Sequence, residues 1–271
     1  MPDNYWLLRA VRLAYAVCRM SSISKAVQLA SRLAKIGVCN PQRLSYVLGT
    51  ALSASDAVVD RSLDLLRLPR VDVNELLPEA GEPLKVELAL FPKTYASVSV
   101  LEFICLVLLL KRTRAERIFE FGTYKGVSIT QLALNVPPGR EIYTLDLPDE
   151  PIATRLVIAD PEDADIAVHK GKGSLIPADL RPRITFLKQD SARFDESPYV
   201  GRMDFVFVDG AHNYDYVKND SEKAWRMLRS GGIIVWHDFR PPDPGVVKYL
   251  LESAYKPLWV YGTALAFATK P

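Results

Sequence analysis

From about residue 95 to the end, short apolar runs alternate with amphipathic stretches of helical length, and this alternation constrains the fold more than any other feature. Five of the runs are rich in β-branched and aromatic residues and are apolar at almost every position, as strands buried on both faces are. They are Arg117–Phe121, Glu141–Leu147, Arg183–Leu187, Met203–Val208 and Gly232–Trp236. Strands that alternate with helices predict βαβ units, and hence a mostly parallel sheet with helices on both faces.

Two further short runs close the sequence. Leu258–Tyr261 and Ala264–Thr269 are joined across residues 262–263, which is the pattern of an antiparallel hairpin. Together with the five buried runs they predict an α/β, Rossmann-like, doubly wound sheet of seven strands, mostly parallel, with an antiparallel last strand. Before the last buried run, Asn213–Arg229 predicts an amphipathic helix that we expect to end at the glycine pair 231–232.

The first 94 residues differ in character and predict a helical lid or packing region followed by a proline-rich connector. Residues 1–50 carry seven Lys or Arg side chains against one acidic residue, Asp3, so their net charge is +6. The spacing of these charges predicts two amphipathic helices. Their basic faces could cover the rest of the protein, lie on an anionic membrane through residues 1–36, or form a partner surface, and the sequence leaves these alternatives open. Prolines in residues 69–92 mark the connector, so the main domain is expected to span residues 95–271.

The overall charge and the cysteines narrow the class of protein. With 34 basic and 32 acidic residues, the chain has a net charge of +2, which is too balanced for a DNA-binding protein and disfavours RNA as a partner. Its three cysteines form no CxxC pair, so neither a zinc knuckle nor a disulfide scaffold is expected. A reducing, cytoplasmic compartment fits this cysteine usage best.

No run reaches the ~18 consecutive apolar residues that a membrane-spanning helix needs. The most apolar run, Phe103–Leu110, is short and has Glu102 and Lys111 beside it, which predicts a buried helix instead. Arg9 and Arg12 interrupt any apolar stretch near the start, so a signal peptide is not expected.

Polar residues follow each of the five buried runs, at the edge of the sheet where ligands of parallel sheets bind. After the first run comes Glu120-Phe-Gly122-Thr-Tyr-Lys-Gly126, and the later runs are followed by Asp146, Asp190-Ser191, Asp209-Gly-Ala-His212 and His237-Asp238. Each could be structural alone, as a glycine turn or a helix cap. Their coincidence predicts a ligand site, because several carboxylates in a crevice are costly unless a ligand, metal or solvent meets them. The glycine pattern is neither GxGxxG nor GxxxxGK(S/T), which argues against dinucleotide dehydrogenases and P-loop nucleotidases.

Three motifs in this order resemble class I S-adenosylmethionine-dependent methyltransferases, and more narrowly the O-methyltransferase-like group. They are EFGTYKG from Glu120, VDGAHNYDYVKND from Val208 and LRSGGIIVWHDF from Leu228. The resemblance covers residues 95–271 and implies that Asp146 holds the ribose of S-adenosylmethionine. It further implies cofactor contacts from Glu120, Gly122, Thr123 and Gly126 at the methionine end, from Asp190 and Ser191 at the adenine, and from Asp209. Many members have a glycine where Tyr124 stands, so this loop must adopt a conformation that accepts a side chain.

The expected reaction is methyl transfer to a hydroxyl group of a small-molecule acceptor. This displacement needs close approach and removal of the hydroxyl proton, so His212, with Asp209 nearby, is the predicted catalytic base. Asp209 and Asp238 follow adjacent strands and could bind a divalent cation such as Mg2+, although the sequence leaves metal dependence open. His237 is expected to be structural, since alternation along the strand should turn it away from Asp238. The polar insertion 148–182, with His169, is expected to be a solvated surface loop, and a lid over the acceptor is the alternative.

Other functions compete with this interpretation. A binding or scaffold protein could keep the cofactor fold without turnover. A methyltransferase acting on RNA would use the basic residues 1–50, and a nicotinamide oxidoreductase is a third alternative. The sequence identifies neither the methyl acceptor nor the oligomeric state.

Overall fold

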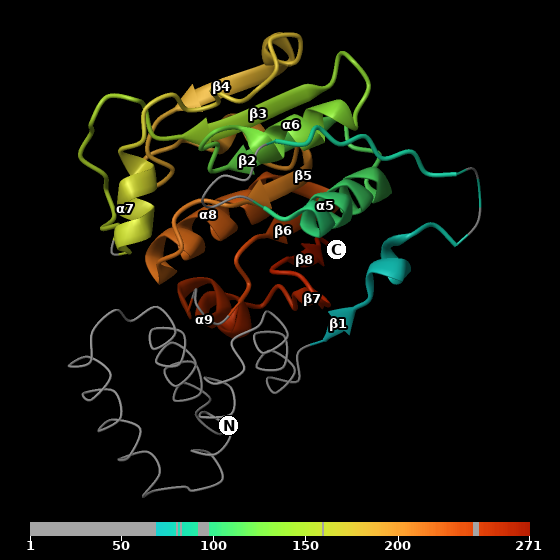
Figure 1. Ribbon diagram of the computed structural model, residues 1–271. Coiled ribbons are helices and arrows are strands. Elements are labelled where there is room, and N and C mark those ends of the chain that lie inside the picture. The colour runs from blue at the N-terminus through green and yellow to red at the C-terminus, as the bar shows by residue number, and fades with distance from the viewer. Residues whose placement is uncertain (1–68, 80, 82, 92–97, 159, 241–243) are drawn as a thin grey trace, which may run out of the picture. The chain divides into compact units, whose positions relative to one another are not determined.

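The computed structural model describes residues 69–271 except 80, 82, 92–97, 159 and 241–243 (Figure 1). The helices predicted within residues 1–50, and the three alternative roles for their basic faces, lie outside the described residues. Residues 69–239 and 245–271 form one compact unit. Within the described part of the chain, every helix falls short of the length and apolar character that crossing a membrane requires.

The core of this unit is a sheet of eight strands in the order β1-β7-β8-β6-β5-β2-β3-β4. Neighbouring strands are parallel except where β8 pairs with β6 and with β7. The strands are β1 Arg70–Val71, β2 Arg117–Phe121, β3 Glu141–Asp146, β4 Ile184–Lys188, β5 Met203–Val208, β6 Leu228–Trp236, β7 Leu258–Val260 and β8 Ala266–Thr269. The predicted Rossmann-like, mostly parallel sheet with an antiparallel last strand is confirmed, and β7 and β8 form the terminal hairpin.

The eighth strand, β1, comes from the segment predicted to be a connector. Arg70 pairs with Trp259 and Val71 pairs with Val260, so β1 extends the sheet beyond β7. The described residues of the predicted connector therefore belong to the compact unit, which includes Pro69–Phe239. A two-residue strand among prolines is too short to show a periodic pattern in the sequence, so only its pairing with β7 identifies it.

The extended residues after β1 are also attached to the unit, through side-chain amides at the end of helix α6 (Val127–Leu134). Gln131 accepts a hydrogen bond from the Ala89 N–H (3.0 Å) and donates one to the Ala89 carbonyl (2.8 Å). Asn135 makes the same pair of bonds to Glu87, at 2.9 and 2.7 Å. We call these four bonds the amide clamp, and they make the predicted connector part of the domain.

Helices cover both faces of the sheet, as predicted (Figure 1). Helices α5 and α6 pack on the face that carries Phe205 and Ile233. Helix α8 packs on the opposite face, where Trp236 Nε1 donates a hydrogen bond to Ser221 of α8 (2.8 Å). The helices are α5 Val100–Arg112, α6 Val127–Leu134, α7 Pro161–Ala167, α8 Tyr214–Met227 and α9 Pro244–Glu252, with 3-10 turns at Val73–Leu76, Arg181–Arg183 and Ser197–Tyr199.

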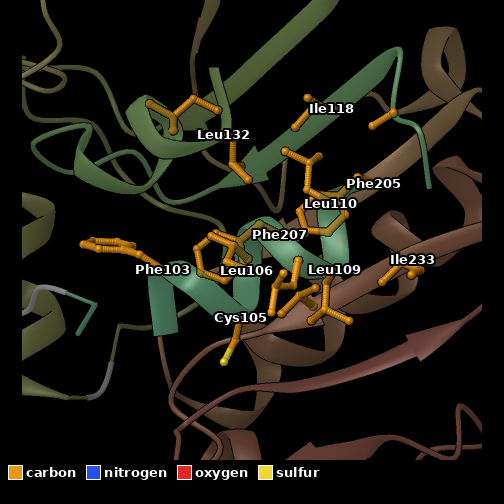
Figure 2. Close-up of a cluster of buried hydrophobic side chains, with 14 of the residues drawn as sticks. Phe103, Cys105, Leu106, Leu109, Leu110, Ile118, Leu132, Phe205, Phe207 and Ile233 are labelled. Atoms are coloured by element: carbon orange, nitrogen blue, oxygen red, sulfur yellow. The ribbon is translucent and has the colours of Figure 1, made fainter. Parts of the chain in front are cut away.

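Helix α5 is the buried helix that the run Phe103–Leu110 predicts (Figure 2). A capping box between Ser99 and Glu102 starts it. Its Leu106 and Leu109 are fully buried in a cluster that includes Phe205 and Phe207 of β5. Truncating such a leucine to alanine leaves a cavity and costs about 2–5 kcal/mol. Helix α5 is therefore a rigid support for Glu102, which reaches the site described below.

The glycine pair 231–232 lies inside β6, so the prediction that it ends α8 is wrong. Helix α8 stops at Met227, and β6 starts directly at Leu228. Gly231 has a φ of 75°, and a Cβ on Gly232 would lie 3.1 Å from the Met203 carbonyl oxygen. The register between β5 and β6 shifts at this point, so the pair allows the two strands to approach where their pairing is irregular.

Candidate active site

The turn between β2 and α6, residues 120–126, depends on two glycines and is called the glycine turn here. Gly122 has a φ of 92°, and a Cβ on it would lie 2.0 Å from the Asp209 carbonyl oxygen, so glycine alone fits between the ends of β2 and β5. Gly126 has a φ of 84°, and Tyr124 adopts a φ of 43°. The loop thus takes a left-handed conformation at the position where the family often has glycine, and it accepts the Tyr124 side chain in that conformation.

Glu120 lies beneath the glycine turn and not on its surface. Its side chain is fully buried and accepts hydrogen bonds from Ser128 Oγ and Thr144 Oγ1, both at 2.6 Å. Burial raises the pKa of Glu120 to about 8, against the opposing effect of these two hydrogen bonds. The carboxyl group therefore joins β2, β3 and α6, and its contact with the methionine end of a cofactor stays a prediction.

Asp146 supports the same turn from the end of β3. Its Oδ2 accepts hydrogen bonds from the backbone N–H groups of Thr123 (3.0 Å) and Tyr124 (2.7 Å), and its Oδ1 accepts one from Leu147 (2.7 Å). The ammonium group of Lys172, from the insertion, lies 3.5 Å from Asp146 Oδ1. A donor of the protein therefore already meets the carboxylate that is predicted to accept from a ribose.

Asp190, at the end of β4, is buried and satisfied in a similar way. Its Oδ1 accepts hydrogen bonds from the Tyr216 hydroxyl (3.0 Å) and the Ala192 N–H (2.9 Å), and its Oδ2 accepts one from the Arg155 N–H (2.7 Å). The carbonyl oxygen of Ser191 accepts a hydrogen bond from Lys223 Nζ (2.6 Å). The predicted cofactor residues thus lie where β2, β3 and β4 end, apart from Asp209, which follows β5. The residues after β3 and β4 are held by neighbouring loops and helices.

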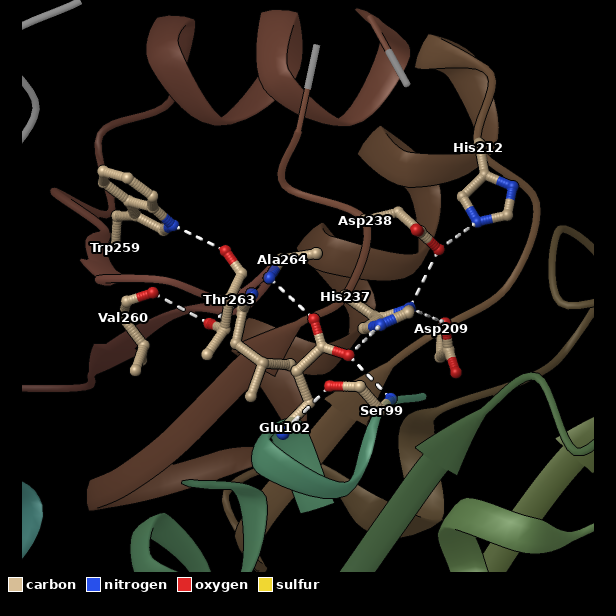
Figure 3. A network of polar contacts seen from close by, with 11 residues as sticks. Ser99, Glu102, Asp209, His212, His237, Asp238, Trp259, Val260, Thr263 and Ala264 are labelled. Atoms are coloured by element: carbon tan, nitrogen blue, oxygen red, sulfur yellow. Dashed lines mark hydrogen bonds and ion pairs between the residues drawn. The ribbon is translucent and has the colours of Figure 1, made fainter. Parts of the chain in front are cut away.

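A chain of carboxylates and imidazoles lies at the ends of β5 and β6 (Figure 3). His212 Nε2 and His237 Nδ1 both contact Asp238 Oδ2, at 2.7 and 2.9 Å. His237 Nδ1 also lies 3.0 Å from Asp209 Oδ1, and its Nε2 lies 3.6 Å from Glu102 Oε2. We call the complete set the acid–imidazole network, and its members are Glu102, Asp163, Asp209, His212, His237 and Asp238.

The side chains of His237 and Asp238 meet, so the prediction that strand alternation separates them is wrong. Asp238 adopts a φ of 53°, in the left-handed region, which ends the regular alternation directly after β6. A non-glycine residue persists in this conformation only where its surroundings hold it, and contacts with His212 and His237 hold Asp238. His237 is consequently part of the polar site.

Burial and the oppositely charged neighbours shift the pKa values of these groups in opposite directions, and the effect of the neighbours is the larger. Burial alone would lower the pKa of His212 and of His237, but the carboxylates beside them raise both well above the usual value. Burial alone would raise the pKa of Asp238, but the two imidazoles hold it well below its usual value. Burial also opposes the ionisation of Glu102, whose pKa His237 and backbone hydrogen bonds nevertheless lower to about 2. At neutral pH the network therefore holds imidazolium rings between carboxylates.

The network contains ligand atoms that could hold a metal ion. One such atom from each of Asp209, His212 and Asp238 lies within 4.8 Å of the others. The predicted metal ligands Asp209 and Asp238 are therefore neighbours, and the predicted base His212 lies with them. Carboxylate oxygens suit a hard cation such as Mg2+, whereas an imidazole ligand would extend the choice to transition metals.

The insertion 148–182 packs on both parts of this edge, so the expectation of a solvated surface loop is wrong for its inner residues. Asp163 and Lys172 are buried, at 5% and 4% exposed. The Gly173 N–H donates a hydrogen bond to the Tyr124 carbonyl (2.7 Å), and the His169 ring lies 5.0 Å from the Tyr124 ring. These contacts agree with the alternative interpretation of the insertion as a lid.

Glu102, Asp163 and Lys172 belong to the site, but the sequence analysis missed them. The pattern Ser99-x-x-Glu102 at the start of an apolar run signals a capping box, and it could have drawn attention to Glu102. Asp163 and Lys172 stand among other charged residues of a polar insertion. No local signal separates them from neighbours that face solvent.

Comparisons with known proteins identify similar sequences and structures. Residues 119–239 match the family model described as a methyltransferase domain. A caffeoyl-CoA O-methyltransferase from Medicago sativa is 26% identical over 207 residues, which cover 74% of this chain and 76% of that protein. One from Petroselinum crispum is 27% identical over 207 residues, covering 74% and 78%. Among solved structures, an O-methyltransferase from Bacillus cereus in complex with SAH is 19% identical, with a TM-score of 0.46 over 65% of this chain and 84% of that one.

The sheet order, the glycine turn after β2 and the matched family model together define a methyltransferase domain. The matched domain and the O-methyltransferase relatives support a class I S-adenosylmethionine-dependent O-methyltransferase, in agreement with the resemblance given above.

Proposed function

We propose that this enzyme transfers a methyl group to a hydroxyl oxygen of a small molecule, with His212 as the general base and a divalent cation such as Mg2+ on Asp209 and Asp238. The observation that carries the proposal is the position of these three side chains, whose ligand atoms lie within 4.8 Å of one another. The backbone of Asp209 lies directly against Gly122 of the glycine turn. A base and two carboxylates at this place can bind a hydroxyl group and remove its proton beside the methyl donor.

Transfer to oxygen on a small acceptor is supported by the relatives. The matched proteins from Medicago sativa and Petroselinum crispum are both caffeoyl-CoA O-methyltransferases, and each alignment covers about three quarters of this chain. Caffeoyl-CoA is therefore the first acceptor to test, and other small hydroxylated molecules follow.

The residues at the ends of β3 and β4 suit the cofactor. The ribose hydroxyls and the adenine amino group are hydrogen-bond donors. In the structure the Asp190 carboxylate accepts a hydrogen bond from the Arg155 N–H, and the Lys172 ammonium group lies 3.5 Å from Asp146 Oδ1. Exchanging these protein donors for those of the cofactor would leave the ribose on Asp146 and the adenine beside Asp190 and Ser191. The methionine end would lie on the glycine turn, at Gly122, Thr123 and Gly126. The sulfonium group supplies the methyl group and leaves as a neutral thioether.

His212 acts as a base only while its ring is neutral. Its Nε2 contacts Asp238 and its Nδ1 contacts Asp163, and these carboxylates raise the pKa of the ring well above the usual value, although burial opposes this. An acceptor hydroxyl that enters between His212 and Asp238 would replace the second contact and give its proton to Nε2. Activity is therefore expected to rise with pH through this raised pKa, since the deprotonated imidazole is the active form.

Asp209 and Asp238 have the chemistry of a hard-cation site. Two carboxylates leave most of the coordination positions of Mg2+ to water and to acceptor oxygens, which is the usual arrangement for this ion. A bound cation would lower the pKa of an acceptor hydroxyl that coordinates to it.

Calorimetric titration with S-adenosylhomocysteine, with and without Mg2+, tests the cofactor site. Binding is expected for the wild type and for Glu150→Ala, an exposed acidic residue near the site. Asp146→Ala should weaken binding about 10-fold or more, because hydrogen bonds to a charged group contribute about 1.5–3 kcal/mol. Absence of binding to the wild type in any condition contradicts the proposal.

Transfer of labelled methyl groups to caffeoyl-CoA and to a panel of phenols, catechols and sugars tests the reaction. The proposal expects a product methylated at oxygen and a rate that falls after exhaustive chelation and returns with Mg2+. Full turnover after chelation would remove the metal from the proposal, while full turnover by His212→Ala would remove the base.

A further inference from the structure

Helix α7 of the insertion brings one buried carboxylate to His212. Asp163 is 5% exposed, whereas Asp165 on the same short helix is exposed to solvent. The two residues have the same side chain and lie two positions apart. Their difference in burial shows that α7 presents Asp163 selectively to the site.

Asp163 holds His212 by two atoms. Its Oδ2 accepts a hydrogen bond from the His212 backbone N–H (2.7 Å), and its Oδ1 contacts His212 Nδ1 (2.5 Å). On the other side of the His212 backbone, a Cβ on Gly245 would lie 2.0 Å from the His212 carbonyl oxygen, so the main chain is closely packed there as well. Both the backbone and the ring of His212 are thus fixed in place.

The contact to Nδ1 determines which ring nitrogen can react. An ionised carboxylate accepts a hydrogen bond and cannot donate one, so Asp163 favours a proton on Nδ1 and Asp238 favours one on Nε2. When an acceptor hydroxyl takes the place of Asp238, as proposed above, Asp163 still holds the proton on Nδ1 and leaves Nε2 to react. Nε2 is then the nitrogen that faces Asp238 Oδ2, at 2.7 Å, beside Asp209. Without Asp163, the ring could rotate or hold its proton on the other nitrogen.

We propose that Asp163 is a positioning residue for His212, supplied to the site by the insertion 148–182. This inference rests on the proposed function, because His212 is assigned there as the base. The insertion accordingly has two tasks, since it covers the glycine turn through residues 169–173 and orients His212 through Asp163.

The alternative is that Asp163 only anchors the insertion, and Asp163→Asn separates the two roles in the full-length protein. Asparagine keeps the size of the side chain and can still accept from the His212 backbone N–H, but it cannot hold Nδ1 as a carboxylate does. Asp165→Asn is the matched control on the same helix. The chain contains three histidines, so ring nitrogen spectra of histidine-labelled protein can be assigned with single substitutions of His169 and His237.

We expect the His212 ring signals of the wild type to show a proton on Nδ1, and we expect Asp163→Asn to change the Nδ1 signal of this ring more than the signals of His237 or His169. With an acceptor that the wild type turns over, kcat should fall about 10- to 100-fold, the effect of removing an orienting partner of a functional histidine. The affinity for S-adenosylhomocysteine should stay near that of Asp165→Asn, whereas the melting temperature should fall, because the substitution removes one carboxylate from a buried imidazole. Asp163→Glu, which keeps a carboxylate, should recover part of the loss.

Unchanged His212 ring signals in Asp163→Asn overturn the inference whatever the activity. A loss of cofactor affinity as large as the loss of kcat also overturns it and leaves an anchoring role. If the wild type fails to bind S-adenosylhomocysteine, the proposed function fails, but the ring spectra still decide whether Asp163 positions His212.

Discussion

Two parts of the site hold their acidic side chains in different ways. At the ends of β2 and β3, mainly neutral donors hold the carboxyl groups of Glu120 and Asp146. At the ends of β5 and β6, imidazoles hold the carboxylates of Asp209 and Asp238. Two hydroxyl groups bond Glu120, and three backbone N–H groups bond Asp146. Asp238 instead shares one oxygen between His212 and His237.

The acidic residues of this sheet therefore have two different roles. On the glycine-turn side, the acids hold the backbone in a shape that a cofactor can fit. On the network side, the charges hold one another, and removing one leaves an imidazolium without its partner in a poorly hydrated place. We therefore expect substitutions in the network to change catalysis and stability strongly, and substitutions beside the glycine turn to act more weakly on cofactor binding and on pH dependence.

The largest effect is expected for His212→Gln. Removing a general base typically lowers the rate about 10²- to 10⁴-fold. The affinity for S-adenosylhomocysteine should change little, because the predicted cofactor residues apart from Asp209 lie at the ends of β2, β3 and β4. Steady-state rates and calorimetry on His212→Gln measure the two quantities, with His169→Gln as the control histidine. If His169→Gln lost as much rate as His212→Gln, the special role of the network in catalysis would be contradicted.

Asp238→Asn should have the next largest effect, on stability. It leaves His212 and His237 beside an amide, and breaking a buried ion pair costs about 3–5 kcal/mol. The free energy of unfolding in denaturant measures this loss. It should be greatest between about pH 4 and 6.5, above the unfolded pKa of the carboxyl group and below that of the imidazoles, and it should shrink in stronger acid as Asp238 itself is protonated. The exposed Asp179→Asn is the control and should change the free energy by no more than about 0.5 kcal/mol. A loss for Asp238→Asn as small as that of the control would show that the network charges are not mutually dependent.

Glu120→Gln tests the glycine-turn side through pH. Burial raises the pKa of Glu120 from 4.5 to about 8, so the folded protein binds this proton more tightly than the unfolded chain. The wild type should therefore lose stability as pH rises from about 4.5 to 8, by at most about 1.4 kcal/mol per pH unit from this group. Glu120→Gln lacks this loss, so its melting temperature relative to the wild type should increase over the same range. A constant difference across that range would contradict the raised pKa.

The smallest effect is expected for Lys172→Met, which removes the ammonium group beside Asp146. Without this competing donor, S-adenosylhomocysteine should bind a few-fold more tightly, since a single partly screened ion pair contributes about 0.2–1 kcal/mol. Calorimetry measures the change, and Lys170→Met, on an exposed neighbour, is the control. Weaker binding in Lys172→Met would instead mean that the lysine contacts the cofactor.

The strands could be predicted because each carries its own signal. The bounds of β2 and β5 agree with the apolar runs Arg117–Phe121 and Met203–Val208, and the hairpin of β7 and β8 agrees with the glycine between its two runs. β1 could not be predicted, because two residues among prolines acquire strand geometry only through pairing with β7.

The candidate site could be predicted only in part, for a similar reason. Position after a strand was sufficient to bring Asp209, His212 and Asp238 together. The contact between His237 and Asp238 depends on a left-handed backbone at Asp238, which local alternation does not reveal. Asp163 reaches His212 from a residue 49 positions earlier in the chain, and only the folding of the insertion determines that meeting.

In the amide clamp, two side chains at the end of α6 bond the main chain of alternate residues in the extended segment, as a neighbouring strand would. Gln131 and Asn135 are four residues apart, which is about 6 Å along a helix. Residues 87 and 89 repeat at about 6.7 Å in an extended chain, so the two spacings match closely enough for paired bonds. All four bonds go to main-chain atoms, and none depends on which side chain stands at 87 or 89. The four bonds of the clamp therefore do not depend on the side chains at these two positions, except that proline lacks the N–H that the clamp requires.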